Sequence, residues 1–141
     1  MPTLSVRPEL QIVWPQNEGF EESRVGRVFN HRRPSRCPLA IVHARSESDI
    51  ISAINLGKEL DCKVSVRSGG HSFPVWSVRD RSILIDLGTF NSIDLDERSG
   101  IVEVGPATTA GELNRFLGTK RRMFNTGHCP TVGLGGFLYP L

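Results

Sequence analysis

Two stretches of the chain combine glycines with side chains that can act as nucleophiles. The first glycine stretch, RSGGHS at residues 67–72, places a histidine directly after two glycines. The second glycine stretch, GHCPTVGLGG at residues 127–136, places a cysteine among four glycines. A neutral imidazole nitrogen and a thiolate both form bonds to electrophilic carbon. Each stretch is therefore a candidate for a binding or reaction site.

The first glycine stretch has a composition that suits an anion. Glycine adopts positive φ and allows close approach of a ligand, so Gly69 and Gly70 can expose consecutive backbone N–H groups. A concavity of such donors binds phosphate or pyrophosphate, and the hydroxyls of Ser68 and Ser72 would add donors. The alternative is a tight turn after an edge strand that leaves His71 on the surface. For this stretch alone the tight turn is favoured, because Gly-Gly after a strand is common.

The second glycine stretch departs from the glycine pattern of a Rossmann fold. With Gly133 and Gly135 as the first two glycines of that pattern, the third would fall on Leu138. A nicotinamide-binding interpretation therefore fails. The alternative for Cys129 is a buried structural thiol among glycines that let the backbone pack closely, and this is favoured for a lone cysteine. The neighbouring His128 is expected to face solvent.

Apolar periodicity around these stretches predicts the elements that hold them. Ser46 with Asp49, and Thr108 or Thr109, are typical of helix N-termini. The strand, helix and strand that come first predict a βαβ unit with a right-handed crossover, and the alternation further on predicts an antiparallel hairpin. The fold class is therefore α+β. The sequence predicts strands at 38–44, 62–70 and 81–88, helices at 46–61 and 108–118, and a hairpin at 91–106.

The two ends of the chain show little periodicity. Residues 1–33 are expected to form a lead-in that wraps the surface of a domain at residues 34–141. The glycine-rich segment from residue 123 onward is expected to be a loop. Several further residues are expected to have structural roles: His31 and His43 as surface or hydrogen-bonded histidines, Trp14 and Trp76 in packing, and Asp86, Asp94 and Asp96 on solvated strand faces.

The composition argues against several classes of protein. With 141 residues, of which 38% are hydrophobic and 23% charged, the chain is long enough for one globular domain. A net charge of +2 and scattered arginines do not make the basic stripe of a nucleic-acid-binding protein. No run has the length of a membrane span or a signal peptide, so a cytoplasmic location is expected. Three cysteines without a C-x-x-C pair favour neither a disulfide framework nor a metal site.

Taken together, the two glycine stretches lead to a known family. VRSGGHS is followed by a β-rich spacer containing LIDLGTFNSIDLDERSGIVEVGPATTAGEL and then by GHCPTVGLGG. In this order the chain, over roughly residues 34–137, resembles the FAD-binding, PCMH-type domain of berberine-bridge-enzyme-like oxidases. These belong to the vanillyl-alcohol-oxidase class of flavoproteins. The resemblance implies that fold and FAD as the cofactor.

The resemblance also implies which residues bind the cofactor. The pyrophosphate of FAD would lie on the first glycine stretch, and the flavin would lie along the backbone of the second. The implied cofactor-binding residues, besides the two nucleophiles, are Arg67, Ser68, Gly69, Gly70, Ser72, Gly127, Val132, Gly133, Gly135 and Gly136.

In family members with a bicovalent flavin, a histidine and a cysteine hold the ring. The histidine of the S-G-G-H motif bonds the flavin 8α-methyl group, and the cysteine of the G-x-C-x-x-V-G motif bonds ring carbon 6. The matching residues here are His71 and Cys129. Two such bonds would fix the ring and make the flavin a stronger oxidant.

The resemblance covers the N-terminal portion of the family's architecture. Members of the family continue beyond the GLGG motif with the rest of the FAD domain and a separate substrate-binding domain. The resemblance therefore implies a small-molecule substrate for the full-length form, bound by parts that this chain does not match. Two alternatives remain at this point: a fragment that binds FAD weakly without catalysis, and a fragment that acts only through protein interaction.

Overall fold

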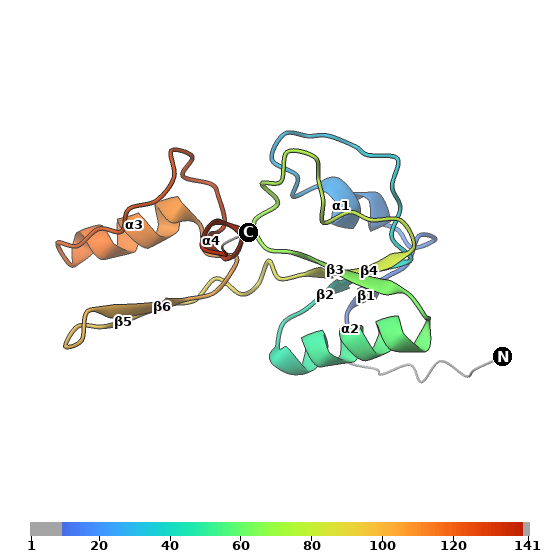
Figure 1. Ribbon diagram of the computed structural model, residues 1–141, viewed down its shortest axis with the longest axis horizontal. Coiled ribbons are helices and arrows are strands. Elements are labelled where there is room, and N and C mark those ends of the chain that lie inside the picture. Colours follow the sequence, from blue (N-terminus) through green and yellow to red (C-terminus); the bar gives the residue numbers. More distant parts are fainter. Residues whose placement is uncertain (1–9, 140–141) are drawn as a thin grey trace.

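The computed structural model describes residues 10–139 and arranges them in two parts that lie side by side (Figure 1). One part is a four-stranded sheet with helix α1 (Phe20–Val25) on one side and helix α2 (Glu47–Glu59) on the other. The other part is the hairpin of β5 (Ile93–Asp96) and β6 (Ile101–Val104), which lies against helix α3 (Ala110–Thr119). The predicted α+β class is confirmed.

The sheet has the strand order β1-β2-β4-β3. Strands β2 (Ala40–His43), β4 (Ser82–Asp86) and β3 (Lys63–Arg67) run parallel, and β1 (Ile12–Val13) is antiparallel to β2. Strand β2, helix α2 and strand β3 form the predicted strand–helix–strand unit, and β4 lies between its two strands in the sheet. Every residue of β4 is buried, because this strand is central and helices cover both faces of the sheet.

Residues 10–33 do more than cover the surface. Strand β1 pairs Ile12 with Val42, and Phe20 of α1 belongs to the same buried cluster as Ile41. The expected lead-in therefore supplies an edge strand and part of the core. A two-residue strand and a six-residue helix are too short to show a period in the sequence. The domain boundary at residue 33 stays a prediction.

Both long helices begin at predicted caps. The Oγ of Ser46 accepts a hydrogen bond of 3.2 Å from the backbone N–H of Asp49. At the start of α3 the backbone N–H of Glu112 donates to Thr109 Oγ1, and the N–H of Thr109 donates to Glu112 Oε2. This reciprocal pair is a capping box. Of the two candidates, Thr109 is the cap, while Thr108 is buried.

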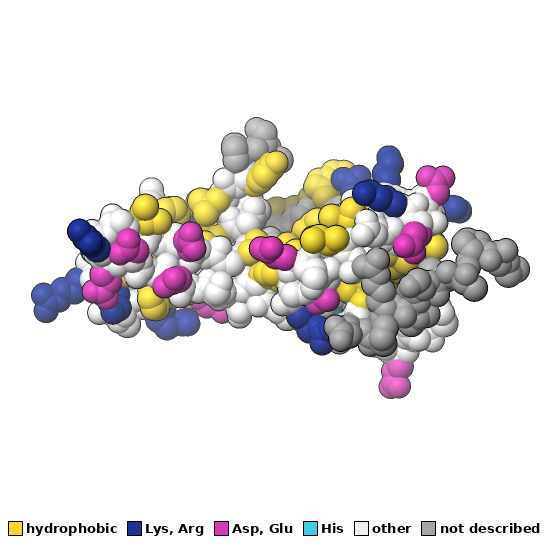
Figure 2. Space-filling model, turned by 90° about the horizontal axis from the view of Figure 1, so that it is seen from below, with side chains coloured by type: hydrophobic (Ala, Val, Ile, Leu, Met, Phe, Trp, Pro, Cys, Tyr) yellow, Lys and Arg dark blue, Asp and Glu magenta, His cyan; other side chains and the backbone are white. Residues whose placement is uncertain are grey.

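The hairpin turns its apolar side toward α3. Leu95 and Val102 pack against the buried cluster that includes Leu113 and Leu117 of that helix. Asp94 and Asp96 alternate with these residues and are exposed, as predicted. Figure 2 shows acidic side chains along this outer face of the hairpin. The second part of the molecule therefore has its own small core.

The segment from residue 123 onward is not entirely a loop. Residues Leu134–Phe137 form the short helix α4, and Leu134 is buried in the cluster under α3. Two of the four helical residues are glycines, so no apolar period marks this helix in the sequence. The second glycine stretch consequently ends in a helical turn between the two parts (Figure 1).

Candidate functional site

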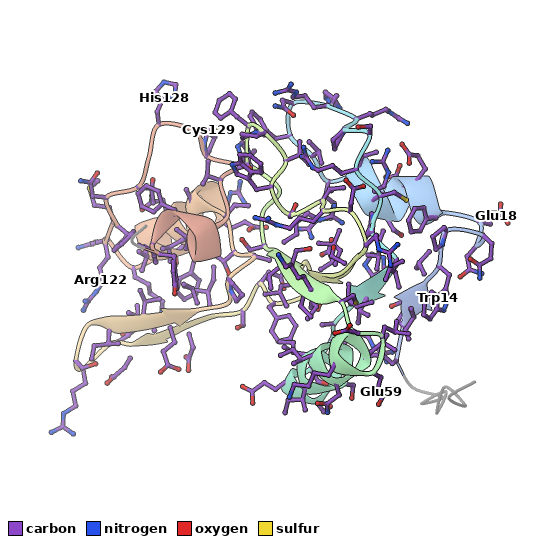
Figure 3. The ribbon with its side chains drawn as sticks, turned by 45° about the vertical axis from the view of Figure 1, so that its right-hand side comes forward. Trp14, Glu18, Glu59, Arg122, His128 and Cys129 are labelled. Atoms are coloured by element: carbon purple, nitrogen blue, oxygen red, sulfur yellow. The ribbon has the colours of Figure 1, made fainter. Side chains whose placement is uncertain are left out.

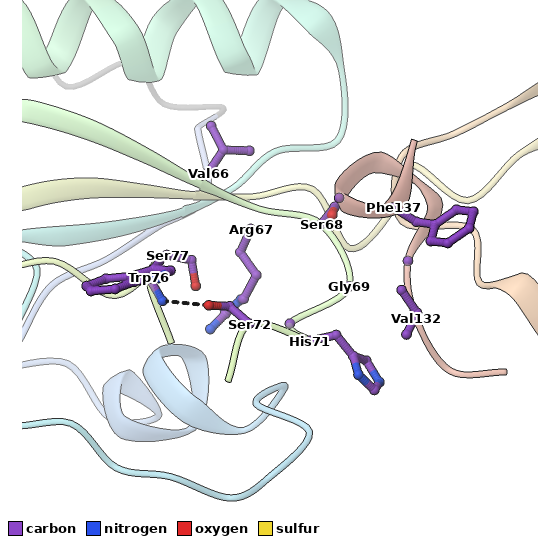
Figure 4. A pocket seen from close by; sticks show the side chains of 13 residues that line it. Val66, Arg67, Ser68, Gly69, His71, Ser72, Trp76, Ser77, Val132 and Phe137 are labelled. Atoms are coloured by element: carbon purple, nitrogen blue, oxygen red, sulfur yellow. Dashed lines mark hydrogen bonds between the residues drawn. The ribbon is translucent and has the colours of Figure 1, made fainter. Parts of the chain in front are cut away.

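The two glycine stretches border an open crevice of about 540 Å³ (Figure 4). Strand β3 leads into the first stretch, and the second stretch runs alongside it into α4. The crevice is lined by Val66, Arg67, Ser68, Gly69, Gly70, His71, Ser72, Trp76, Ser77, Val132, Gly133, Gly136 and Phe137. Most of the predicted site residues therefore lie around a single cavity.

Glycine is needed where these backbones meet. A Cβ on Gly69 would lie 2.6 Å from the nitrogen of Gly133, and a Cβ on Gly133 would lie 2.8 Å from the Cα of Gly69. Gly70 has a φ of +77°, and a Cβ there would lie 2.0 Å from the carbonyl oxygen of Arg27. A side chain fits at none of these positions unless the backbone moves. The glycines thus bring three segments of the chain into contact, which a simple tight turn would not do.

The turn of the first glycine stretch also leaves backbone donors unused. Within residues 10–139, no acceptor receives a hydrogen bond from the N–H groups of Gly69, Gly70, His71 or Ser72. The Oγ of Ser72 accepts a 3.1 Å hydrogen bond from the N–H of Trp76, which holds the end of the turn (Figure 4). Consecutive free N–H groups in a glycine turn bind anionic oxygens. The residues present therefore fit a phosphate-containing group.

His71 lies between an aromatic ring and the second glycine stretch. Its ring stacks on Phe29, with centroids 4.2 Å apart and planes inclined by 14°. Its Nε2 lies 2.8 Å from the Oγ1 of Thr131. Partial burial lowers the pKa of His71, so the imidazole is neutral at neutral pH. A neutral imidazole held from two sides is a suitable nucleophile.

Cys129 reaches the same hydroxyl group. Its Sγ lies 3.4 Å from the Oγ1 of Thr131, and the thiol is exposed and free of any disulfide. The alternative of a buried structural thiol is therefore wrong. His128 faces solvent as predicted, pointing outward from the loop (Figure 3). The two candidate nucleophiles, distant in the sequence, thus meet at Thr131, which neither motif singled out.

Asp86 is buried rather than on a solvated face, which corrects the prediction for this residue. It is 2% exposed, and its Oδ2 accepts hydrogen bonds from Arg67 Nε at 2.8 Å and Nη2 at 2.5 Å. Its Oδ1 pairs with Arg27. Burial lowers the pKa of the Arg67 guanidinium, and the Asp86 carboxylate opposes that shift. Alternation along one strand could not reveal that neighbouring elements cover both faces of β4.

The guanidinium of Arg67 binds inside the fold. It donates to the carbonyl oxygens of Arg24 at 2.7 Å and Ser23 at 2.5 Å, besides its pair with Asp86. Arg27 donates to the carbonyl oxygen of Ser68 at 2.5 Å. These bonds tie α1 and the segment after it to the start of the first glycine stretch. Arg67 lines the crevice, but its charged group positions the loop instead of reaching for a ligand.

The second glycine stretch is fastened to the start of α3. The N–H of Ala110 donates to the carbonyl oxygen of Val132 at 3.0 Å, and the N–H of Leu134 donates to that of Thr108 at 2.8 Å. These two bonds form an isolated antiparallel bridge around Gly133. The cap of α3 and the wall of the crevice are therefore one connected piece of structure.

Three predicted site residues lie outside the crevice lining. Gly135 packs on Pro106, where a Cβ would approach the proline Cβ to 2.6 Å. Gly127 packs against the ring of Phe137, which a Cβ would approach to 3.3 Å. Cys129 is exposed beside the crevice, in contact with Thr131. In this structure the two glycines serve packing, while Cys129 stays available for reaction.

Some residues of the site carried no signal in the sequence. Trp76, expected to pack, is 59% exposed on the crevice, with the Arg36 guanidinium 5.7 Å from its ring centroid. Phe137 is also exposed there. Phe29 enters the site through its stack on His71, and Thr131 through its contacts with His71 and Cys129. A single aromatic or hydroxyl residue has no spacing pattern, so only the folded chain identifies it.

The other expectations concern residues away from the crevice. Trp14 packs against the core as predicted, and His43 is hydrogen-bonded to Ser23 Oγ at 3.0 Å. Within residues 10–139, no helix is long and apolar enough to cross a membrane. The same part of the chain contains no group of three or more His, Cys, Asp or Glu residues that could hold a metal ion.

Residues 38–139 match the model of the FAD binding domain family. The chain belongs to this family. It is 45% identical over 133 residues to the FAD-linked oxidoreductase janO of Penicillium janthinellum, covering 93% of this chain and 30% of that protein. The FAD-binding domain expected from the two glycine stretches is therefore confirmed, and FAD is its cofactor.

Solved structures show the same fold for this FAD-binding domain. The BBE-like 1 protein of Physcomitrella patens superposes with a TM-score of 0.80 at 23% identity, over 91% of this chain and 28% of that one. A carbohydrate oxidase from Microdochium nivale superposes with a TM-score of 0.76 at 30% identity, over 90% of this chain and 27% of that one. The chain thus spans under a third of the length of the relatives it matches.

Proposed function

We propose that this FAD-binding domain holds its flavin covalently, through His71 and also through Cys129, as part of an FAD-linked oxidase. The observation that carries the proposal is the meeting of both nucleophiles at one hydroxyl. Thr131 Oγ1 lies 2.8 Å from His71 Nε2 and 3.4 Å from Cys129 Sγ. A single rigid ring placed beside that hydroxyl would be within reach of both side chains.

The residues present support this proposal at each end of the cofactor. The free N–H groups from Gly69 to Ser72 would hold the pyrophosphate. The backbone at Val132 and Gly133 would border the flavin, since both residues line the same crevice. When bound, the flavin supplies two-electron oxidation chemistry. The chain's own part is to bind the cofactor, orient it and present a neutral imidazole and a thiol.

For the full-length form we propose a small-molecule substrate, such as an alcohol, a sugar or an alkaloid-like molecule, with oxygen as the electron acceptor. The Microdochium nivale relative is named as a carbohydrate oxidase in complex with a substrate analogue, which supports the sugar class. This chain spans 30% of the janO protein. The substrate contacts are therefore proposed to come from the part of the full-length protein that this chain does not match.

A second candidate is a fragment that binds FAD weakly, or that acts by pairing with another protein. Apolar side chains at and near the crevice favour it: Trp76 is 59% exposed, Phe137 43% and Leu138 50%. Exposed apolar surface of this kind is typical of a region that another segment or protein covers. The size of the purified chain in solution distinguishes this candidate, because pairing makes the apparent size rise with protein concentration.

The test is to express residues 1–141, precipitate the protein with acid and look for flavin absorbance and fluorescence. Flavin in the pellet supports a covalent bond, which tryptic peptides carrying the flavin mass then assign to His71 or Cys129. Flavin only in the supernatant shows binding without a bond and overturns the covalent part. A colourless protein that also fails to bind added FAD supports the form of the second candidate that acts by pairing with another protein.

A further inference from the structure

Thr131 is the one residue within 10–139 whose side chain contacts both candidate nucleophiles. A hydroxyl has a single proton to donate and two lone pairs with which to accept. It can therefore donate to at most one of the two partners, and when it accepts from one, its own proton is available to the other. The direction of these two hydrogen bonds decides the tautomer of His71 and whether Cys129 Sγ faces a donor.

The contacts of His71 favour one direction. Among residues 10–139, Nε2 has a hydrogen-bond partner in Thr131, and Nδ1 has none. If Thr131 donated to Nε2, the neutral ring would carry its proton on Nδ1, where no acceptor lies. A donor without an acceptor in a half-buried place is less favourable than a free lone pair. The proton therefore belongs on Nε2, which donates to Thr131.

The position of the hydroxyl is fixed from both sides. The carbonyl oxygen of Pro130 accepts a 2.8 Å hydrogen bond from the N–H of Gly111, and that of Val132 accepts one of 3.0 Å from Ala110. Both donors lie in the first turn of α3. Thr131 is thus held between two anchored neighbours although its side chain is exposed. On the other side, the stack on Phe29 fixes the plane of the imidazole.

We propose that Thr131 is a positioning residue that prepares both nucleophiles through one ordered chain, in which His71 Nε2–H donates to Thr131 Oγ1 and Thr131 Oγ1–H donates to Cys129 Sγ. This direction leaves the Nδ1 lone pair of His71 free to react. It also points the hydroxyl proton of Thr131 at Cys129 Sγ, so that a reacting thiolate there would have a hydrogen-bond donor. The role of these two hydrogen bonds in bonding flavin rests on the proposed function. Their existence in the protein without added cofactor does not.

The test compares Thr131→Val, which removes the hydroxyl at nearly constant shape, with Thr131→Ser, which keeps it. Nitrogen-15 NMR of histidine-labelled protein without added FAD reports the tautomer of His71, assigned by its loss in His71→Ala. The wild type and Thr131→Ser are expected to carry the proton on Nε2, and Thr131→Val to show a mixture of tautomers. A wild-type proton on Nδ1, or an unchanged tautomer in Thr131→Val, overturns the proposal.

Alkylation by iodoacetamide tests the hydrogen bond from Thr131 to Cys129. In Thr131→Val the rate at Cys129 should fall about fivefold, the factor that one hydrogen bond of ordinary strength corresponds to, and Thr131→Ser should restore it. The exposed Cys37 in the same molecule is the internal control and should not change. Equal rates at Cys129 in the wild type and Thr131→Val overturn the thiolate part.

Flavin incorporation separates this inference from the proposed function. If the tautomer and the alkylation rate respond as expected while wild-type protein bonds no flavin, the proposed function fails and the hydrogen-bonded chain stands. If wild-type protein bonds flavin and Thr131→Val bonds it at the same rate with the same yield at both residues, the proposed function stands and the positioning role of Thr131 is overturned.

Discussion

At the scale of single residues, the surroundings of the histidines explain why one of them suits covalent chemistry. His31 and His128 are exposed, and His43 is hydrogen-bonded to Ser23 away from the crevice. His71 alone among the four lines the crevice. Burial lowers the pKa of both His43 and His71, but only in His71 is the neutral ring beside a cavity. The suitability of His71 for the proposed bond therefore follows from its position as well as from its residue type.

The first prediction concerns the replacement Cys129→Ala. The flavin should then be linked through His71 alone, because the stack on Phe29 and the contact with Thr131 do not depend on the thiol. Mass spectrometry of tryptic peptides should find flavin on the peptide of His71 in close to wild-type amount. Cys37→Ala is the matched control and should keep both linkages. Loss of all covalent flavin in Cys129→Ala would contradict the independent placement of His71.

The second prediction is that Gly69→Ala destabilises the domain and impairs FAD binding together. The new Cβ would lie 2.6 Å from the Gly133 nitrogen, so the two stretches must separate. Overpacking of this kind lowers the free energy of unfolding by about 1–3 kcal/mol, which urea denaturation measures. Gly118→Ala is the control, because a Cβ there meets nothing within 4 Å. Equal stability of the two variants would show that the glycine contact is not required.

At the scale of elements, strand β3 and helix α3 hold the two glycine stretches that border the crevice. Strand β3 ends at Arg67 and delivers the first glycine stretch. The first turn of α3 binds the second through the Ala110 and Gly111 N–H groups. The helix start therefore has two tasks, since Thr109 caps the helix and the next two residues hold the crevice wall.

The third prediction follows from this double task. Thr109→Ala should lower the free energy of unfolding by about 1 kcal/mol, the usual effect of losing an N-cap. It should also lower the yield of flavin bonded to Cys129, because a loosened first turn of α3 holds the segment carrying Thr131 less firmly through the Ala110 and Gly111 N–H groups. Ser46→Ala removes the equivalent cap of α2, far from the crevice, and should reduce stability to a similar extent without changing the flavin yield. A flavin yield that falls equally in both variants would reduce the effect to general stability.

The elements also show what the sequence could and could not predict. Apolar runs and cap residues such as Ser46 and Thr109 predicted β2, α2, β3, β4, the hairpin and α3, because these signals are local. Strand β1, α1 and α4 were missed, since two to six residues give no period. Thr131 and Phe29 were missed for a different reason. Their roles depend on contacts with His71, which the sequence does not show.

At the scale of the whole molecule, one buried carboxylate joins the segments behind the crevice. Asp86 at the end of β4 pairs with Arg67 at the end of β3 and with Arg27 after α1. Arg27 in turn donates to the carbonyl oxygen of Ser68, at the start of the first glycine stretch. The sheet, the segment after α1 and the turn of the first glycine stretch are thus held by the carboxylate of Asp86. Stability of the domain and the geometry of its site should be coupled through Asp86.

The last prediction tests that coupling with two aspartates that the sequence did not distinguish. Asp86→Asn removes the charge that pairs two arginines in a place 2% exposed. Removing one partner of a buried ion pair destabilises by about 3–5 kcal/mol, a large share of the stability of a small domain. Asp94→Asn, on the exposed face of the hairpin, should change the free energy of unfolding by less than about 0.5 kcal/mol.

Urea denaturation followed by circular dichroism measures both values. Titration with FAD should then show weaker binding for Asp86→Asn and unchanged binding for Asp94→Asn, because only the first residue fixes the turn that carries Ser68 and His71. If the two variants unfold at the same urea concentration, the ion pair does not stabilise the fold. If Asp86→Asn is destabilised yet binds FAD as the wild type does, the carboxylate supports the sheet without positioning the site.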